Sequence, residues 1–157
     1  MAVRSGARAV ADVSRGMILA SVEIAAAPER VFAAVSSAEI ANWWGAPDLY
    51  RVTKWTGELK VGGTWRSEGV SVDGKPFAVG GEYLEVDPPR VLVQTWKPDW
   101  TPGPPTTVRY QIDPIPGGAR VTVRHEGFVD AAACESHSAG WERVLGWLKS
   151  YADDAAV

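Results

Sequence analysis

The two histidines, His125 and His137, are the residues of this chain best suited to proton transfer, because imidazole titrates near neutral pH. On the last predicted strand, Val121 and Val123 alternate with polar residues and share a face with His125. His137 comes one helical turn before Trp141, on the apolar stripe of the last predicted helix. Since both apolar faces must be buried, we expect both histidines to face the interior, where either could act as a general acid or base.

The chain contains eight tryptophans, which require either a large core or a cavity walled by aromatic rings. Small-molecule sites combine apolar walls with a few polar groups, and strand alternation places both kinds of side chain inward here. The alternative is that the same rings and histidines are ordinary core residues. The residues predicted to contact a ligand are Trp55, Trp65, Ser67, Gln94, Trp96, Trp100, Tyr110, His125, His137, Trp141 and Leu145.

Other chemistries find little support in the sequence. Two histidines and the single Cys134 have no metal-ligand spacing, so we expect no metal site. The glycine pairs at residues 62–63 and 80–81 stand alone in strand context and favour a turn and a bulge over a phosphate-binding loop. No Gly-x-Ser-x-Gly sequence is present, and Cys134 is most simply a small buried apolar residue. We therefore expect no cofactor.

Strands and helices are segregated along the chain, which favours the α+β class. Residues 17–24 alternate as a strand, and Pro28 then occupies the first position of a helix. A short second helix is predicted at residues 38–44, and Asp130 is a plausible N-cap for the last one. From residue 51 onward, turn signals separate the strands of a predicted antiparallel meander, and a long helix follows at residues 131–152. The predicted strands lie at residues 52–59, 64–70, 76–86, 91–96, 106–112 and 120–126.

Length and charge predict a single domain and limit the partners. The chain has 157 residues, and we expect residues 17–152 to form one domain after a flexible leader at 1–16, with an added edge segment as the alternative for that leader. The net charge is -3 without a basic patch, and no apolar run approaches the ~20 residues of a membrane span. We therefore expect neither nucleic acid nor a membrane as a partner, and a weak homodimer stays open. One cysteine fits a reducing compartment, which predicts a cytoplasmic protein.

Several segments, in order, resemble the START-like helix-grip (SRPBCC) superfamily, in the branch of the activator of heat-shock-protein-90 ATPase homologues. The resemblance implies a six- or seven-stranded antiparallel sheet curved around the C-terminal helix, with two short helices after the first strand. Ala27 replaces the polar cap common before the first helix, and the loop at residues 97–105 is richer in proline than usual. The matching segments, spanning nearly the whole chain, lie at residues 24–32, 43–45, 59–65, 81–96, 125–128 and 140–148.

Three functions remain open from the sequence. The first is binding of a small apolar ligand, aromatic or polyketide-like, in a cavity between the sheet and the C-terminal helix. The second is an enzyme of the cyclase, dehydratase or hydrolase type that uses His125 or His137 as a general acid or base. The third is a chaperone-interaction module. A cavity alone satisfies the first hypothesis, whereas the second also needs a partner that orients the histidine.

Overall fold

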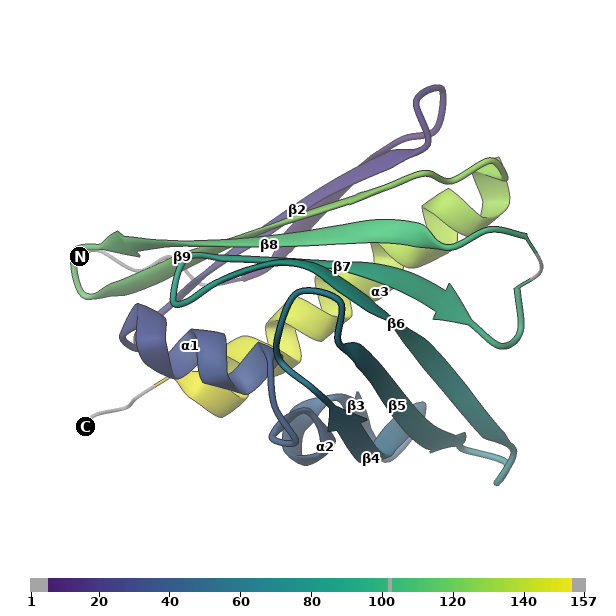
Figure 1. Ribbon diagram of the computed structural model, residues 1–157, viewed down its shortest axis with the longest axis horizontal. Coiled ribbons are helices and arrows are strands. Elements are labelled where there is room, and N and C mark those ends of the chain that lie inside the picture. Colours follow the sequence, from purple (N-terminus) through teal and green to yellow (C-terminus); the bar gives the residue numbers. More distant parts are fainter. Residues whose placement is uncertain (1–5, 102, 154–157) are drawn as a thin grey trace.

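A curved antiparallel sheet wraps around one long helix in the computed structural model, which describes residues 6–101 and 103–153 (Figure 1). The strand order in the sheet is β1-β2-β9-β8-β7-β6-β5-β4-β3, and each neighbouring pair is antiparallel. The elements are β1 (Arg8–Asp12), β2 (Met17–Ile24), α1 (Pro28–Val35), α2 (Ile40–Trp43), β3 (Gly45–Ala46), β4 (Tyr50–Gly57), β5 (Thr64–Ser71), β6 (Pro76–Asp87), β7 (Val91–Pro98), β8 (Thr106–Ile115), β9 (Gly118–Glu126) and α3 (Ala131–Ala152).

The α+β helix-grip class is confirmed, but the sheet has nine strands rather than six or seven. One added strand is β1, which pairs with β2 from Arg8 opposite Ser21 to Asp12 opposite Met17. The flexible leader expected at residues 1–16 is therefore wrong for this segment, and residues 1–5 lie outside the described part of the chain. Gly16 turns the chain between the two strands with φ +63°, where a Cβ would lie 2.0 Å from the carbonyl oxygen of Phe128.

The core lies on the concave face of the sheet, where α3 packs (Figure 1). The central strands β2, β8 and β9 alternate buried and less buried residues, as a sheet with one covered face requires. Fully buried residues on these strands include Ile18, Ile112 and Val121. No helix in the described part of the chain is long and apolar enough to cross a membrane.

Side-chain contacts fix both ends of α3. The carboxylate of Asp130 caps its start by accepting a hydrogen bond from the backbone N–H of Ala132 at 3.0 Å, as expected from the sequence. In the last turn, the Lys149 ammonium donates to the carbonyl oxygen of Glu23 at 3.0 Å. Asp153 accepts from the backbone N–H of Ala25 at 2.9 Å. The helix is thus held against the end of β2.

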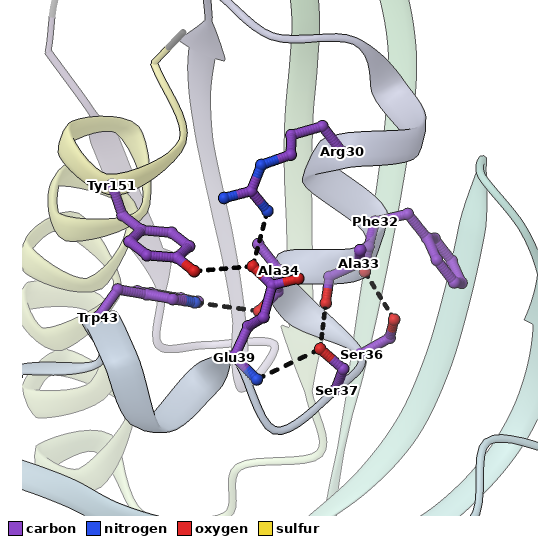
Figure 2. A network of polar contacts seen from close by, with 9 residues as sticks. All are labelled: Arg30, Phe32, Ala33, Ala34, Ser36, Ser37, Glu39, Trp43 and Tyr151. Carbon is purple, nitrogen blue, oxygen red and sulfur yellow. Dashed lines mark hydrogen bonds and ion pairs between the residues drawn. The ribbon is translucent and has the colours of Figure 1, made fainter.

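A polar network joins α1 and α2 to the C-terminal end of α3 (Figure 2). The Arg30 guanidinium and the Tyr151 hydroxyl both donate to Oε1 of Glu39, at 2.7 Å and 2.8 Å. The Trp43 indole N–H donates to the carbonyl oxygen of Ala34 at 3.0 Å. These bonds position α2, which is shorter than the predicted helix at residues 38–44, at one end of the space between the sheet and α3.

Candidate functional site

A cavity of about 440 Å³ lies between α2, α3 and the strands β4 to β8. This volume is within the usual range for small-molecule sites, roughly 300–1,000 Å³. Aromatic and aliphatic side chains make most of the wall, with a few hydroxyl, amide and imidazole groups. The lining residues are Ile40, Trp44, Leu49, Tyr50, Val52, Trp65, Ser67, Ser71, Lys75, Pro76, Phe77, Val79, Gln94, Trp96, Trp100, Tyr110, Ser136, His137, Gly140, Trp141, Arg143 and Val144.

One stripe of α3 forms the helical wall of the cavity. Ser136, His137, Gly140, Trp141 and Val144 recur at spacings of three and four residues, so they share one face of the helix. Gly140 leaves this wall open, because a Cβ built at its position meets no atom within 4 Å. A side chain placed there would enter the cavity.

Trp96 is the centre of the aromatic wall. Its ring centroid lies 5.7 Å from that of Trp65 and 6.0 Å from those of Trp44 and Trp141. Trp44 also contacts Trp141 edge-on at 5.9 Å. Such offset and tilted pairs are the favourable arrangements for aromatic rings. The cluster gives the cavity a wall of indole faces and edges, suited to a flat apolar molecule.

His125 lies behind this wall, and both of its ring nitrogens are engaged. The Trp141 indole N–H donates to Nδ1 at 2.9 Å, and Nε2 lies 2.6 Å from the hydroxyl oxygen of Thr106. Because an indole can only donate, Nδ1 carries no proton and Nε2–H donates to Thr106. The Thr106 hydroxyl then donates to the carbonyl oxygen of Trp96 at 3.3 Å. We call these four residues the closed layer, since its hydrogen bonds use both nitrogens of the imidazole.

Burial keeps both histidines neutral. Desolvation, and after it the neighbouring His137, hold the pKa of His125 well below its usual value. Desolvation also lowers the pKa of His137, against an opposing contribution from its hydrogen bond to the Ala133 carbonyl. That bond, 2.9 Å long, places the His137 proton on Nδ1, because a carbonyl oxygen only accepts. His137, whose ring is half-buried, lines the cavity, and its Nε2 carries no proton.

Three buried polar atoms have no hydrogen-bond partner among the described residues. They are Nε1 of Trp65, Oε1 of Gln94 and Nε1 of Trp96. All three residues line the cavity. These atoms have almost no accessible surface, so they are enclosed within the wall and are not exposed to the cavity.

The cavity opens to solvent where α3 faces the β5–β6 turn and the β7–β8 loop. Trp100 of that loop is 55% exposed and packs edge-on against Phe77 at 5.8 Å. Lys75 and Arg143 line the mouth, are exposed, and form no ion pair within the described residues. Aspartate and glutamate are absent from the described lining residues, so the charged groups of this lining are cations.

Most of the residues predicted to contact a ligand line the cavity, and three do not. A register shift between Val52 and Lys54 places Trp55 on the same face as Val52, opposite Ser67, where it packs against the core but does not line the cavity. Leu145 is fully buried on the core side of α3, and the closed layer encloses His125. The expectation that these three residues line the cavity is wrong. Those that do line it are Trp65, Ser67, Gln94, Trp96, Trp100, Tyr110, His137 and Trp141.

Several residues that line the cavity were not predicted from the sequence, chiefly Trp44, Tyr50, Phe77 and Arg143. Trp44 follows Trp43 directly, and successive helical residues point in different directions, so one ring can enter the core while the other reaches the cavity. Phe77 belongs to β6, whose inward face the sequence left undecided. That question is settled by Tyr83, which is buried between the exposed Glu82 and Leu84, and by Val79, which is buried and lines the cavity.

The described residues contain no group of three or more histidine, cysteine, aspartate or glutamate side chains that could hold a metal ion. Cys134 is fully buried, and burial raises the pKa of its thiol. Its sulfur lies 3.8 Å from the carbonyl oxygen of Met17, away from the cavity residues. The wall therefore offers shape, aromatic surface and a few neutral hydrogen-bonding groups.

Comparisons with known proteins place this geometry in a family context. The family model of activator of Hsp90 ATPase homolog 1-like proteins matches residues 25–153. No curated protein matches the chain. Among solved structures, a Rhodobacter sphaeroides protein is similar at 21% identity and a TM-score of 0.81, covering 98% of this chain and 100% of its own.

Two further solved structures are somewhat closer in sequence. A Chromobacterium violaceum protein shares 26% identity, with a TM-score of 0.76, over 88% of this chain and 97% of its own. An AHSA1 protein from Silicibacter pomeroyi also shares 26% identity, with a TM-score of 0.71, over 86% of this chain and 96% of its own. The similarity therefore extends over nearly the whole length of each protein.

Proposed function

The chain belongs to the family of activator of Hsp90 ATPase homolog 1-like proteins, and from that premise we propose that it binds a small apolar ligand, aromatic or polyketide-like. The observation that carries this proposal is the cavity of about 440 Å³ between the sheet and α3. Its size and its aromatic walls with few polar groups are typical of small-molecule sites. Trp100 and Phe77 at the mouth would cover a bound molecule.

Binding is better supported than catalysis by the placement of the two histidines. General acid–base catalysis requires a titratable group that reaches the substrate. His125 is separated from the cavity by Trp141 and Trp96, and its two nitrogens are occupied within the protein. His137 borders the cavity, but its Nδ1 is bonded to a backbone carbonyl rather than to a carboxylate that would stabilise a protonated ring. A ligand carrier or sensor needs neither group to titrate.

Two glycines of α3 provide a matched test. A Cβ meets no atom within 4 Å at either Gly140 or Gly146, but only Gly140 is among the lining residues of the cavity. Gly140→Leu should fill part of the cavity and weaken binding of naphthalene at least roughly tenfold, about 1.4 kcal/mol. Affinity is measured by NMR titration of the protein with naphthalene.

Gly146→Leu is the control. Both substitutions replace a helical glycine and should raise or preserve helix stability, by up to about 1 kcal/mol. Gly146→Leu should leave naphthalene affinity unchanged. Equal affinity of naphthalene for wild type and Gly140→Leu, or no binding to wild type, would contradict the proposed function.

A further inference from the structure

The described wall of the cavity carries charge only at its mouth. Lys75, in the turn between β5 and β6, and Arg143, on α3, are exposed lining residues, and no described aspartate or glutamate lines the cavity with them. Deeper in the wall, His137 is held neutral, because burial lowers the pKa of its ring. A bound molecule therefore meets apolar and neutral groups inside the cavity and two cations where it reaches solvent.

Tyr50 of β4 connects the surroundings of the two cations. Its ring centroid lies 5.5 Å from that of Phe77, which follows Lys75 by two residues. The centroid of Trp147, one helical turn after Arg143, lies 5.8 Å from it. Burial raises the pKa of the Tyr50 hydroxyl, and the positive charge of Arg143 is among the effects that oppose this shift, so the guanidinium acts on the cavity side of α3. Two cations from different elements thus flank one part of the mouth.

Neither cation is neutralised by the described part of the chain. Nine other lysines and arginines form ion pairs there, whereas Lys75 and Arg143 form none. Asp73, the acid nearest to Lys75 in sequence, accepts hydrogen bonds from the Ser71 hydroxyl and from the backbone N–H of Lys75. Glu142 precedes Arg143 on α3 but is rotated about 100° from it around the helix. Both cations are therefore available to a ligand.

We propose that the cavity binds an aromatic carboxylate, with its ring among the tryptophans and its carboxylate at the mouth between Lys75 and Arg143. This inference rests on the proposed binding function and specifies its ligand class. The planar guanidinium can bind a carboxylate through two parallel N–H···O bonds, and the ammonium adds a second positive charge. At the mouth the carboxylate keeps part of its hydration, whereas deep in the cavity it would lose its water without a cationic partner.

The two cations are expected to supply selectivity and orientation rather than most of the affinity. Exposed ion pairs are individually weak, so the aromatic body provides the larger share of binding. A carboxylate held at the mouth directs the apolar end of the ligand inward. The chain as a whole has a net charge of -3, which does not attract an anion. Affinity for a carboxylate should therefore depend on these two residues and not on the overall charge.

Titrations with 2-naphthoate, 2-naphthamide and naphthalene, followed by calorimetry or NMR, test this inference. The first two probes have nearly the same shape and differ in charge, and naphthalene is the apolar body alone. Lys75→Gln/Arg143→Gln should weaken 2-naphthoate binding roughly three- to tenfold, the effect of two exposed ion pairs. The same variant should bind 2-naphthamide and naphthalene within about twofold of wild type. Added NaCl should weaken 2-naphthoate binding to wild type more than to this variant.

Arg51→Gln/Lys54→Gln is the matched control, because it removes the same two charges elsewhere. Both residues are exposed cations of β4 that form no ion pair among the described residues, and neither lines the cavity. Arg51 lies between Tyr50 and Val52, which both line the cavity, so its side chain points to the other face of the strand. The control should bind all three probes within about twofold of wild type.

Three results would overturn this inference while cavity binding stands. They are an unchanged affinity of Lys75→Gln/Arg143→Gln for 2-naphthoate, an equal loss in the control variant, and binding of naphthalene but not 2-naphthoate by wild type. Equal losses for all three probes in Lys75→Gln/Arg143→Gln would also overturn it, because charge would not be what was recognised. Failure of all three probes to bind wild type would overturn the proposed function, and this inference with it.

Discussion

The closed layer around His125 and a second group of buried polar atoms in the cavity wall share Trp96, yet they differ in their hydrogen bonds. In the closed layer, hydrogen bonds run from the Trp141 indole through His125 and Thr106 to the Trp96 carbonyl. In the second group, which we call the enclosed polar atoms, Nε1 of Trp65, Oε1 of Gln94 and Nε1 of Trp96 have no partner among the described residues. Trp96 belongs to both, through its carbonyl on one side and its indole on the other.

This difference separates hydrogen-bonded from unpaired buried groups within one aromatic cluster. A satisfied buried network holds its members in one arrangement, and removal of any member leaves another unpaired. Buried groups without a partner lower stability instead. The closed layer is therefore expected to fix the position of Trp141 in the cavity wall. Changes in the two regions should have effects of opposite sign on the folded state.

Removal of Trp141 should have the largest effect. Its side chain is 3% exposed, and its loss would both delete a large buried ring and leave Nδ1 of His125 unpaired. Trp141→Ala should lower the free energy of unfolding by about 3–5 kcal/mol. Trp141→Phe keeps a ring and loses the hydrogen bond, so about 1–3 kcal/mol is expected. Chemical denaturation measures both, and a loss below about 1 kcal/mol for Trp141→Ala would refute the structural role of the layer.

The closed layer should also make stability depend on pH. The pKa of His125 lies below the value of 6.5 expected in an unfolded chain, so the unfolded state binds more protons below that pH. The contribution of His125 to stability is therefore fully present above about pH 6.5 and decreases as the pH falls toward the folded-state pKa. The slope for one such group is at most about 1.4 kcal/mol per pH unit.

This dependence is measured by denaturation curves between about pH 5 and about pH 7.5, the range in which histidine side chains titrate. His137 also has a lowered pKa and acts in the same direction, so His125→Gln and His137→Gln are measured separately. Of the two variants, His125→Gln should show the flatter dependence of stability on pH, because the imidazole that it removes is more deeply buried than that of His137. A profile as steep as that of wild type would show that His125 is not held neutral.

A smaller effect of opposite sign is expected among the enclosed polar atoms. Gln94→Met removes a buried acceptor that has no partner among the described residues, so it should raise the free energy of unfolding by up to about 1 kcal/mol. Thr106→Val is the matched change in the closed layer and should lower it by about 1–3 kcal/mol, since His125 and the Trp96 carbonyl lose their partner. Equal destabilisation by both would erase the distinction between the two regions.

Alternation along the strands predicted which side chains face inward, and this was correct for Trp65, Gln94, Tyr110 and His125. It could not predict depth within the interior. Whether an inward residue borders open space depends on what the opposite element places against it, and Trp141 of α3 covers His125. Residues 8–12 gave no strong strand pattern, because an edge strand has few buried positions to reveal it.

Local irregularities account for other differences from the expected site. The register shift in β4 places Val52 and Trp55 on the same face although they are three residues apart, and no residue type in that segment marks the position of a bulge. The position of Gly140 at the cavity wall could not be predicted either, because the sequence indicates only that a glycine has a low helix propensity. Its open surroundings depend on the distance of α3 from the sheet, which the sequence does not specify.

The indole N–H signals of the eight tryptophans test the central claim most directly. Each is assigned by its Trp→Phe variant in ¹H–¹⁵N correlation spectra, and spectra of the free protein and of its naphthalene complex are compared, so that ring-current shifts locate the bound ring. We expect shifts at Trp44, Trp65 and Trp96, which line the cavity, and little change at Trp55, which packs outside it. No shift at Trp44, Trp65 and Trp96, or an equal shift at Trp55, would contradict the account.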